Sequence, residues 1–330
     1  MNILITGSQG YLGQIVLKKL HHLKDALGIQ KIIGLDIHDV NSGILDYTYI
    51  KKDIRDTSIC ELCIEHKVTH IVHLAAILNT QNHSREFLYD VDVLGTKNIL
   101  EAAVAANAEQ IIISSSGAAY GYHADNPNWL AETDPLRGND DYPYSHHKKL
   151  IEEMMADYKK EHPKLHQVIF RVCTILGKTT DNLITDLFKK KNIIGIRGYE
   201  SPFVFVWDED IANCMVQAVE HHIDGIFNVA GNGSITNKDI ASILQKKYRN
   251  IPSGILSSLL WIGKKLKLSQ YGPEQLIFLK YRPVLNNQKL IHQFPYTLQK
   301  TSLETFHYYL SENQIPFNKE ANIQIQYPNN

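Results

Sequence analysis

Short apolar runs alternate with helical patterns through the first 170 residues, and this alternation most limits the folds open to the chain. The runs are rich in β-branched residues and almost continuously apolar, as is typical of strands buried on both faces. Strands that alternate with helices predict a parallel, doubly wound α/β sheet with its ligands at the carboxyl ends of the strands. The expected strands are Asn2–Thr6, Lys31–Leu35, Tyr47–Lys51, His70–Leu74, Gln110–Ser114 and Gln167–Arg171. The expected helices lie near residues 11–25, 57–66, 84–106 and 145–161.

The second half of the chain follows a looser pattern. Its expected elements are helices near 182–191 and 209–221 and the strands Val204–Trp207 and Ile226–Val229, before mostly helical sequence. A chain of 330 residues is longer than one typical domain of about 100–200 residues. We therefore predict a main domain over residues 1–172, which residues 204–232 rejoin. Residues 173–203 and 233–330 are predicted to form a smaller substrate-binding lobe.

The composition argues against several classes of protein. The 34 basic and 35 acidic residues give a net charge of −1, whereas nucleic-acid binders carry a basic excess. No apolar stretch reaches the roughly 18 residues that span a bilayer, and the first residues form a strand rather than a signal peptide. We therefore expect a cytoplasmic protein with no nucleic acid partner and no stable membrane insertion. Four scattered cysteines fit a reducing compartment: Cys60, Cys63, Cys173 and Cys214.

A glycine-rich segment joins the first expected strand to the first expected helix. Glycines there permit a tight turn and a close approach of the backbone to a pyrophosphate, and the N–H groups of the helix start face the anion. Its position between strand and helix predicts a dinucleotide-binding loop rather than a merely structural turn. The residues assigned to the cofactor are Gly7, Gln9, Gly10, Tyr11, Leu12 and Gly13.

Asp36 ends the second expected strand and selects between the two nicotinamide cofactors. A carboxylate at this place accepts hydrogen bonds from the ribose hydroxyls of NAD and repels the 2′-phosphate of NADP. The next residues, Ile37 and His38, offer no guanidinium for that phosphate. We therefore predict NAD.

Tyr144 and Lys148 lie four residues apart and share one face of a helix that Pro143 begins. The positive charges of Lys148 and of an oxidised nicotinamide would stabilise the phenolate of Tyr144. The phenol could then exchange a proton with a substrate hydroxyl while hydride moves to or from the cofactor. Ser114 and Ser116 follow an apolar strand, and Ser116 could hold the substrate oxygen for Tyr144.

Together these segments resemble the extended short-chain dehydrogenase/reductases, in the branch of NAD-dependent epimerases and dehydratases that includes UDP-glucose 4-epimerase-like proteins. The resemblance covers most of the chain, and its most specific motifs lie in the first half. The segments that carry it are TGSQGYLG at 6–13, Asp36, Asp53-Ile54, His73-Leu74-Ala75-Ala76, SSSGAAYG at 114–121, Tyr144 with Lys148, Arg171–Gly177, Trp207–Ala212, Phe227–Gly231 and Lys238–Ala241.

The resemblance implies a Rossmann-type fold, NAD as the cofactor, and a catalytic triad of Ser116, Tyr144 and Lys148. It also implies a homodimer formed through the helices near 84–106 and 145–161. The remaining cofactor contacts that it implies are Asp53 and Ile54 at the adenine, Leu74, Ala75, Ala76 and Ser114 along the cleft, Lys148 at the ribose and Val172 near the carboxamide.

Three residues depart from the family pattern. Asp92 replaces a usual Asn, while Thr174 and Phe203 stand where epimerases often hold the diphosphate with Asn and Arg. An apolar wall does not replace the hydration of a diphosphate. We therefore expect little interconversion of UDP-glucose and UDP-galactose. A different nucleotide sugar could be held by other basic residues: Arg197, Lys280 or Arg282.

Other patterns have simpler explanations. Cys60 and Cys63 fit buried helix thiols better than a zinc or redox pair. Three pairs of neighbouring histidines lack the spacing of a metal site and are expected on solvated helix faces, so no metal is predicted: His21-His22, His146-His147 and His221-His222. The amphipathic segment 255–268 is expected to be a packed helix of the smaller lobe, with a lid or a membrane contact as the alternatives.

The sequence thus predicts an NAD-dependent enzyme of the extended short-chain type that acts on a secondary alcohol of a small molecule. The substrate is expected to be a nucleotide sugar or a related compound, with an epimerase, a dehydratase and a plain dehydrogenase all open. One alternative is a ketone reductase or hydroxysteroid-type dehydrogenase with an apolar substrate. Another is a nonenzymatic NAD-sensing regulator, although Tyr144 and Lys148 are both present.

Overall fold

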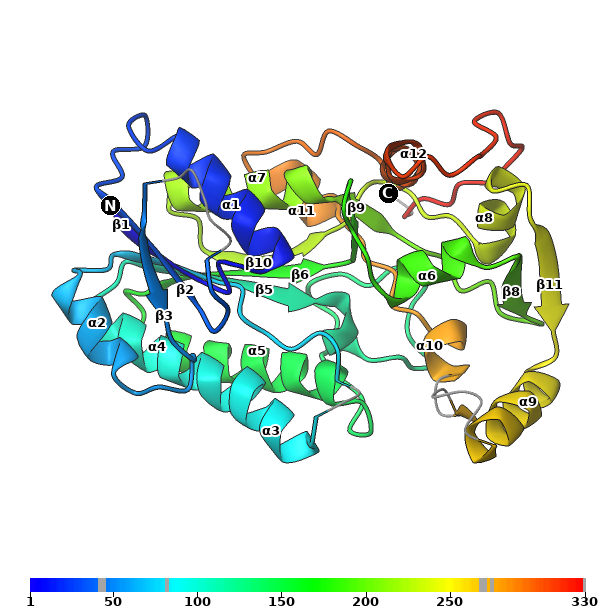
Figure 1. Ribbon diagram of the computed structural model, residues 1–330, viewed down its shortest axis with the longest axis horizontal. Coiled ribbons are helices and arrows are strands. Elements are labelled where there is room, and N and C mark those ends of the chain that lie inside the picture. The colour runs from blue at the N-terminus through cyan, green and yellow to red at the C-terminus, as the bar shows by residue number, and fades with distance from the viewer. Residues whose placement is uncertain (41–45, 81–82, 267–271, 274–275, 329–330) are drawn as a thin grey trace.

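The computed structural model describes residues 1–40, 46–80, 83–266, 272–273 and 276–328. Within these residues seven parallel strands form the central sheet, in the order β10-β6-β5-β4-β1-β2-β3 (Figure 1). They are β1 (Asn2–Thr6), β2 (Lys31–Asp36), β3 (Thr48–Lys51), β4 (His70–His73), β5 (Gln110–Ser116), β6 (His166–Val172) and β10 (Gly225–Val229). The strand order reverses between β1 and β4, which places a ligand crevice at the carboxyl ends of these two strands.

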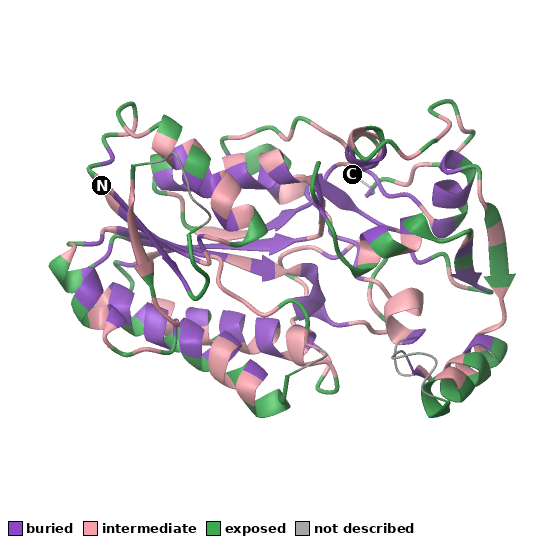
Figure 2. Ribbon diagram, in the orientation of Figure 1, coloured by how far each residue is buried: buried purple, intermediate pink, exposed green. Residues whose placement is uncertain are grey.

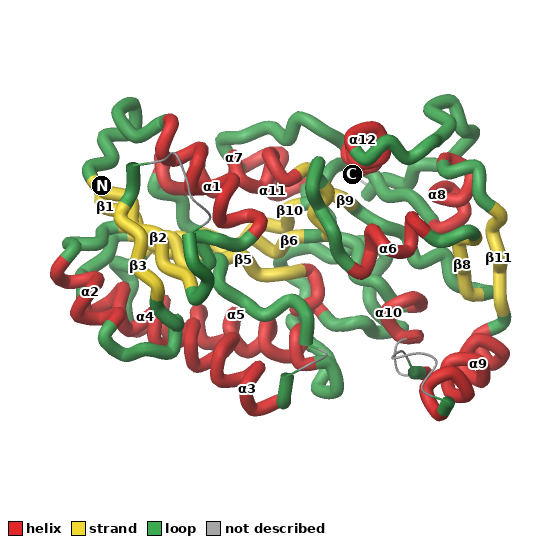
Figure 3. The backbone as a smooth tube through the Cα atoms, viewed as in Figure 1, coloured by secondary structure: helices red, strands yellow, loops and turns green. Residues whose placement is uncertain are grey.

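Helices cover both faces of the sheet, which confirms the predicted doubly wound α/β fold (Figures 1 and 3). Alternate residues of one strand serve opposite faces, since Ile3 and Ile5 pack into one apolar cluster and Leu4 into the other. One face is covered by α1 (Tyr11–His22), α7 (Asp208–His221) and α11 (Gln288–Gln293). The other is covered by α2 (Ile59–Glu65), α4 (Gly95–Ala105) and α5 (Pro143–Glu161).

The helix expected over residues 84–106 is interrupted. It begins as α3 (Arg85–Tyr89), continues as the π-helical turn η1 (Asp90–Leu94) and resumes as α4. A π-turn inserts an extra residue and is frequently found at functional sites. Here it carries Asp92 into the interior, where its Oδ1 accepts a hydrogen bond from the backbone N–H of Ile77 at 3.0 Å.

The smaller lobe lies beyond the carboxyl end of the sheet and has its own apolar cluster, to which buried aromatic rings contribute. Its parallel strand pair is β8 (Asn192–Ile196) with β11 (Lys247–Ile251). Its helices are α6 (Leu183–Lys189), α8 (Asn237–Ile243), α9 (Ser253–Lys265), α10 (Leu276–Lys280) and α12 (Ser302–Glu312). The aromatic rings at its centre are Phe188, Phe203, Phe205, Phe306 and Tyr309.

One of the two strands expected to return to the main sheet does so. β10 pairs with β6, whereas β9 (Phe205–Trp207) pairs with β7 (Thr174–Leu176) in a separate two-stranded sheet. The strand expected over Val204–Trp207 therefore forms, but the prediction that it rejoins the main sheet was wrong. The reason is that Phe205 contributes its ring to the core of the smaller lobe, which holds this strand beyond the edge of the main sheet. The proposed division into two domains stays a prediction.

The helix expected over 255–268 forms as α9, but it is mostly exposed (Figure 2). Leu256 is buried against Ile196 and Leu276. Large apolar side chains that remain exposed are Ile255, Leu259, Trp261, Ile262 and Leu266. The expected packed helix therefore packs along one edge only, and residues 267–268 lie outside the described residues. None of the helices described in the chain is long and apolar enough to cross a membrane.

Candidate active site

The glycine-rich loop packs tightly against the end of β4. Gly7 has a φ of +68°, and a Cβ added there would lie 2.7 Å from the backbone N of Ala75. A Cβ added at Gly13 would lie 2.1 Å from the carbonyl oxygen of Gly7. Larger residues therefore do not fit this path. Helix α1 begins after Gly10, and in the described structure no side chain caps its N-terminus and no acidic residue lies in its first turn. Such an end attracts an anion.

Asp36 lies at the end of β2 and faces this loop. Its side chain is 8% exposed, and its Oδ2 accepts a hydrogen bond from the backbone N–H of Gln9 at 2.9 Å. Its Oδ1 accepts another from the backbone N–H of His38 at 3.1 Å. The carboxylate is thus fixed next to the phosphate loop, as a ribose-binding acid requires.

The side chain of Tyr11 extends from the loop toward the second half of the chain. Its hydroxyl donates to Oδ2 of Asp208 at 2.5 Å and accepts from the hydroxyl of Thr180 at 3.0 Å. Burial, followed by the hydrogen bond to Asp208, raises the pKa of Tyr11, so the phenol stays protonated. Tyr11 therefore ties the loop to the start of α7. Leu12 lies partly buried against the core beneath α1.

The predicted adenine contacts lie between β3 and α2. The guanidinium of Arg55 donates to both carboxylate oxygens of Asp53, at 2.7 and 3.0 Å, and these bonds lower the pKa of Asp53. Ile54 is buried, and its Cδ1 would lie 2.6 Å from a Cβ added at Gly95. Asp53 is therefore ionised and oriented by Arg55, while Ile54 packs against α4.

His73 ends β4 and supports the segment Leu74–Ala76. It is buried, and burial lowers its pKa to about 3, so the ring is neutral. The hydroxyl of Thr96 already donates to the carbonyl oxygen of Asp92 at 2.5 Å, so it accepts from Nε2 of His73 at 3.0 Å. Nδ1 of His73 then accepts from the hydroxyl of Thr6 at 2.7 Å. This chain fixes the end of β4 next to the crevice.

Tyr144 and Lys148 meet the carboxyl end of β5. Lys148 is 8% exposed, and its Nζ donates to the carbonyl oxygen of Ser114 at 2.9 Å. The same Nζ lies 5.7 Å from the ring centroid of Tyr144. Ser116 ends β5 opposite Val172 of β6, and its hydroxyl accepts from the backbone N–H of Ala118 at 3.1 Å. Ser114, Ser116 and Val172 thus lie at the carboxyl ends of two neighbouring strands, and Lys148 reaches this end from α5.

The pair His146-His147 does not lie on a solvated face as predicted. His147 is buried, and its Nδ1 lies 3.0 Å from Oδ2 of Asp92. The cause is η1, which brings Asp92 under the first turns of α5. Asp92, the acid that departs from the family pattern, is therefore paired with His147, the residue that precedes Lys148.

Sequence reasoning missed a buried ion pair beneath the site. The guanidinium of Arg171 on β6 binds the carboxylate of Glu152 on α5, with Nη2 and Oε2 at 2.8 Å, and both side chains are at most 4% exposed. Nη1 of Arg171 also donates to the hydroxyl of Tyr120 at 2.7 Å, and the hydroxyl of Ser115 donates to Glu152. A regular α-helical spacing gives no signal for such a pair, because its partners lie on separate elements.

An aromatic cluster with one cation lies beyond Tyr144. The ring of Phe278 lies 4.6 Å from that of Tyr122 and 4.5 Å from that of Tyr142, and Tyr142 is in turn 6.1 Å from Tyr144. Burial raises the pKa of Tyr122 to about 12, with the positive charge of Arg282 opposing the shift. The cluster therefore extends from the catalytic candidate to Arg282.

Arg282 lies directly on Phe203, one of the residues that depart from the family pattern. Its guanidinium carbon is 3.4 Å from the ring centroid of Phe203, and its Nη1 donates to the carbonyl oxygen of Ser201 at 2.8 Å. Burial lowers the pKa of Arg282 to about 10, which leaves it charged at neutral pH. Within the described residues no carboxylate forms an ion pair with it.

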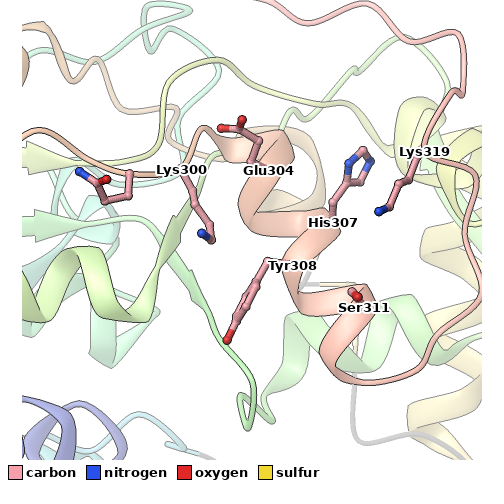
Figure 4. A pocket seen from close by; sticks show the side chains of 7 residues that line it. Lys300, Glu304, His307, Tyr308, Ser311 and Lys319 are labelled. Atoms are coloured by element: carbon pink, nitrogen blue, oxygen red, sulfur yellow. The ribbon is translucent and has the colours of Figure 1, made fainter.

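A shallow pocket lies on α12 (Figure 4). Two of its side chains are already engaged, since Glu304 caps its own helix through Thr301 and Lys300 lies 3.7 Å over the ring of Trp207. None of the predicted site residues lines it: its lining is Gln299, Lys300, Glu304, His307, Tyr308, Ser311 and Lys319. It is therefore not the candidate active site.

Two curated relatives are 28–29% identical to this chain over the stretches that align. The UDP-glucose 4-epimerase of Erwinia amylovora is 29% identical over 186 residues, which cover 54% of this chain and 54% of the relative. A putative UDP-glucose 4-epimerase of Methanocaldococcus jannaschii is 28% identical over 228 residues, 64% of this chain and 72% of the relative. The chain therefore spans about half the length of the first of these relatives.

Solved structures share the fold over nearly the whole chain. The UDP-glucose 4-epimerase of Thermotoga maritima with UDP-glucose superposes with a TM-score of 0.71 and 17% identity, covering 95% of this chain and 99% of that one. The dTDP-glucose 4,6-dehydratase of Bacillus anthracis in complex with NAD gives a TM-score of 0.70 and 19% identity, covering 95% and 96%. At these identities the likeness concerns the fold.

The family comparison extends over most of the chain. The profile of the NAD dependent epimerase/dehydratase family matches residues 3–230, which include the glycine-rich loop, Tyr144 and Lys148. The fold, the family and its cofactor NAD agree with the predictions made from the sequence. The chain belongs to the NAD dependent epimerase/dehydratase family.

Proposed function

We propose that this chain is an NAD-dependent enzyme that acts at a secondary alcohol carbon of a nucleotide sugar, with Tyr144 as the acid and base. One observation carries the proposal. The helix face with Tyr144 and Lys148 meets the carboxyl end of β5, on the side of the sheet where the glycine-rich loop follows β1. Cofactor loop and proton-transfer pair thus lie at one end of the sheet, as hydride transfer requires.

The residues around the crevice fit NAD. The path of the loop leaves no room for a Cβ at Gly7 or Gly13, and the uncapped start of α1 offers its N–H groups to a pyrophosphate. The fixed carboxylate of Asp36 suits the ribose hydroxyls. NAD supplies the hydride acceptor and donor when it is bound. The residues proposed to hold it are Gly7, Gln9, Gly10, Tyr11, Leu12, Gly13, Asp36, Asp53, Ile54, Leu74, Ala75, Ala76, Ser114, Tyr144, Lys148 and Val172.

The proton-transfer step rests on three side chains of this chain. Tyr144 takes the proton of the substrate hydroxyl when the carbon is oxidised, and returns it when the ketone is reduced. The ammonium of Lys148, 5.7 Å from the ring, stabilises the phenolate form. The hydroxyl of Ser116 orients the substrate oxygen.

The lobe side of the site favours a substrate with an anionic part. Arg282 is charged, has no carboxylate partner among the described residues and is held in place by Phe203 and Ser201. A guanidinium in this state suits a diphosphate. The relatives named above are a UDP-glucose 4-epimerase and a dTDP-glucose 4,6-dehydratase. We therefore favour a nucleotide sugar whose diphosphate contacts Arg282. The less favoured substrate is an apolar ketone that binds to the rings of the aromatic cluster.

Replacing Tyr144 by Phe tests the proposal. The Tyr144→Phe variant should lose at least about a hundredfold in turnover, the usual scale for removing a general acid and base, because the ring remains but its proton is gone. NAD affinity, measured by fluorescence titration, should remain. Turnover is measured with NAD and a panel of nucleotide sugars, with a panel of ketones as the second arm. Unchanged turnover in the variant would show that Tyr144 is not the proton donor.

A homodimer through the helices near 84–106 and 145–161 belongs to the same proposal. Tyr89 and Leu94, in α3 and η1, are 40% and 45% exposed, which leaves apolar surface at this place for a second copy. The mass in solution, measured by light scattering, should be twice that of the chain. Leu94→Glu should shift the mass to that of the monomer.

A further inference from the structure

Three side chains of metal-ligand type converge at the amino ends of the parallel strands, away from the cofactor loop. His70 begins β4, Glu109 immediately precedes β5, and His222 follows the last residue of α7. One ligand atom of each residue lies within 4.8 Å of the ligand atoms of the other two. The two histidines are 152 positions apart in the chain, so no sequence spacing reveals the group.

Thr69 orients the ring of His70. The hydroxyl of Thr69 accepts a hydrogen bond from the backbone N–H of Asn2 at 3.0 Å and lies 2.9 Å from Nδ1 of His70. With Nδ1 engaged by Thr69, Nε2 of His70 faces His222. Metal-bound histidines are oriented by such a partner on the second nitrogen.

The spacing of the two imidazoles fits a shared ion. Nε2 of His70 and Nδ1 of His222 are 3.4 Å apart, longer than an ordinary N–H hydrogen bond of about 2.7–3.2 Å. Two nitrogens about 2.0–2.1 Å from a tetrahedral zinc ion lie about 3.3–3.4 Å from each other.

The scaffold holds the ring of His70 and the backbone around His222 in place before any ion binds. His70 is buried in the sheet. The side chain of Gln110, also buried, donates from Nε2 to the carbonyl oxygens of Ala218 and Ile223, both at 2.9 Å. These two bonds clamp the end of α7 to β5 on either side of His222. Glu109 is exposed and can rotate its carboxylate toward the two nitrogens.

We propose that His70, His222 and Glu109 bind one divalent transition-metal ion of the zinc type at the amino end of the sheet. Imidazole nitrogens with one carboxylate are ligands that Zn²⁺ accepts, whereas Mg²⁺ prefers an all-oxygen shell. Water completes the coordination. The ion cross-links β4, β5 and the end of α7, and its binding does not depend on the proposed catalytic activity.

Zinc titration of the full chain tests the site. After treatment with EDTA and dialysis, ZnCl₂ is titrated in competition with a chromophoric chelator, and Co²⁺ absorption reports the coordination geometry. Wild type should bind one ion per chain. His222→Asn should weaken binding at least about tenfold, because even the loss of a supporting partner usually costs 10–100-fold. Asn tolerates the left-handed backbone of His222, at φ 48° and ψ 44°, so the fold is retained.

Two further variants make the test specific. His221→Ala removes the neighbouring exposed histidine, which contacts Gln217, and should leave zinc affinity unchanged. Glu109→Gln should weaken binding, because the neutral amide is a poor ligand. Equal zinc affinity in wild type and His222→Asn, unchanged affinity in Glu109→Gln, or no saturable binding in wild type would each overturn the proposal.

Discussion

Asp36 illustrates how one side chain selects a cofactor. Its two oxygens are held by the backbone N–H groups of Gln9 and His38, so the negative charge has a fixed place beside the loop. Asp36→Ala should weaken NAD binding and reduce the preference for NAD over NADP, because the acceptor of the ribose hydroxyls and the repulsion of the 2′-phosphate are both lost. Titrations of wild type and variant with both cofactors measure the effect. A wild type that bound NADP more tightly than NAD would contradict the assignment.

Glu152 is a residue whose loss should cost much in stability. Removing its charge leaves the buried guanidinium of Arg171 without a counterion, which typically costs about 3–5 kcal/mol. Glu152→Gln should lower the free energy of unfolding by this order, measured by urea denaturation. The matched control is Glu153→Gln, because Glu153 is exposed on the next position of α5 and should change stability by less than about 0.5 kcal/mol. Equal effects in the two variants would refute the buried pair's importance.

Single residues differ in how well the sequence predicts them. Tyr144 and Lys148 could be paired in advance because they lie on one helix at a spacing of four. The contact between Asp92 and His147 could not be predicted, because the two residues are 55 positions apart and meet only where η1 interrupts the helix. The same holds for Arg282, which reaches Phe203 from a separate segment. Local spacing predicts local contacts, whereas these contacts depend on the tertiary fold.

At the scale of elements, the buried strands were the easiest to predict. β1, β4 and β5 lie within two residues of their predicted bounds, because parallel strands covered on both faces must be almost wholly apolar. β8 and β11 were not predicted. They form a separate two-stranded sheet, and β11 carries the exposed polar side chains Lys247, Arg249 and Asn250, so its sequence lacks that apolar signal.

Helix α9 gives a test at the same scale. Leu256 is its one buried side chain among the described residues, while Leu259 is 56% exposed on the same helix. Leu256→Ala should lower the free energy of unfolding by about 2 kcal/mol or more, because a buried Leu leaves a cavity. Leu259→Ala should change it by less than about 0.5 kcal/mol. Urea unfolding of both variants compares them, and a larger loss in Leu259→Ala would contradict the packing of α9 through Leu256.

At the scale of the whole molecule, the two halves of the chain contribute different parts of the proposed site. The sheet supplies the loop, Asp36 and the pair Tyr144–Lys148, while the segments after β10 supply Phe278 and Arg282. The first set lies within residues 3–230, which the family profile matches, and its role in the site stays a prediction. The second set lies outside that match. The chain therefore specifies the class of reaction better than it specifies the substrate.

The residues that would hold a diphosphate bear on whether the chain accepts UDP-hexoses. Thr174 and the fully buried Phe203 occupy the places where epimerases often have diphosphate-binding residues, and Arg282 approaches from another segment. The diphosphate would then bind in a different place relative to Tyr144. We expect interconversion of UDP-glucose and UDP-galactose to be slow or absent, measured by separating the products after incubation with NAD. Turnover of roughly 1–1000 per second, which is typical of enzymes, would contradict this expectation.

Arg282 decides between the charged and the apolar substrate once a turnover substrate is found. For a nucleotide sugar, Arg282→Ala should raise the KM at least about tenfold, since a charged hydrogen bond contributes about 1.5–3 kcal/mol. Arg282→Lys should restore part of the affinity, because the charge returns without the planar fork of donors. NAD affinity serves as the control and should not change, because Arg282 lies on Phe203 of the smaller lobe. An unchanged KM in Arg282→Ala would assign the site to an uncharged alcohol or ketone bound by the rings of Tyr122, Tyr142 and Phe278.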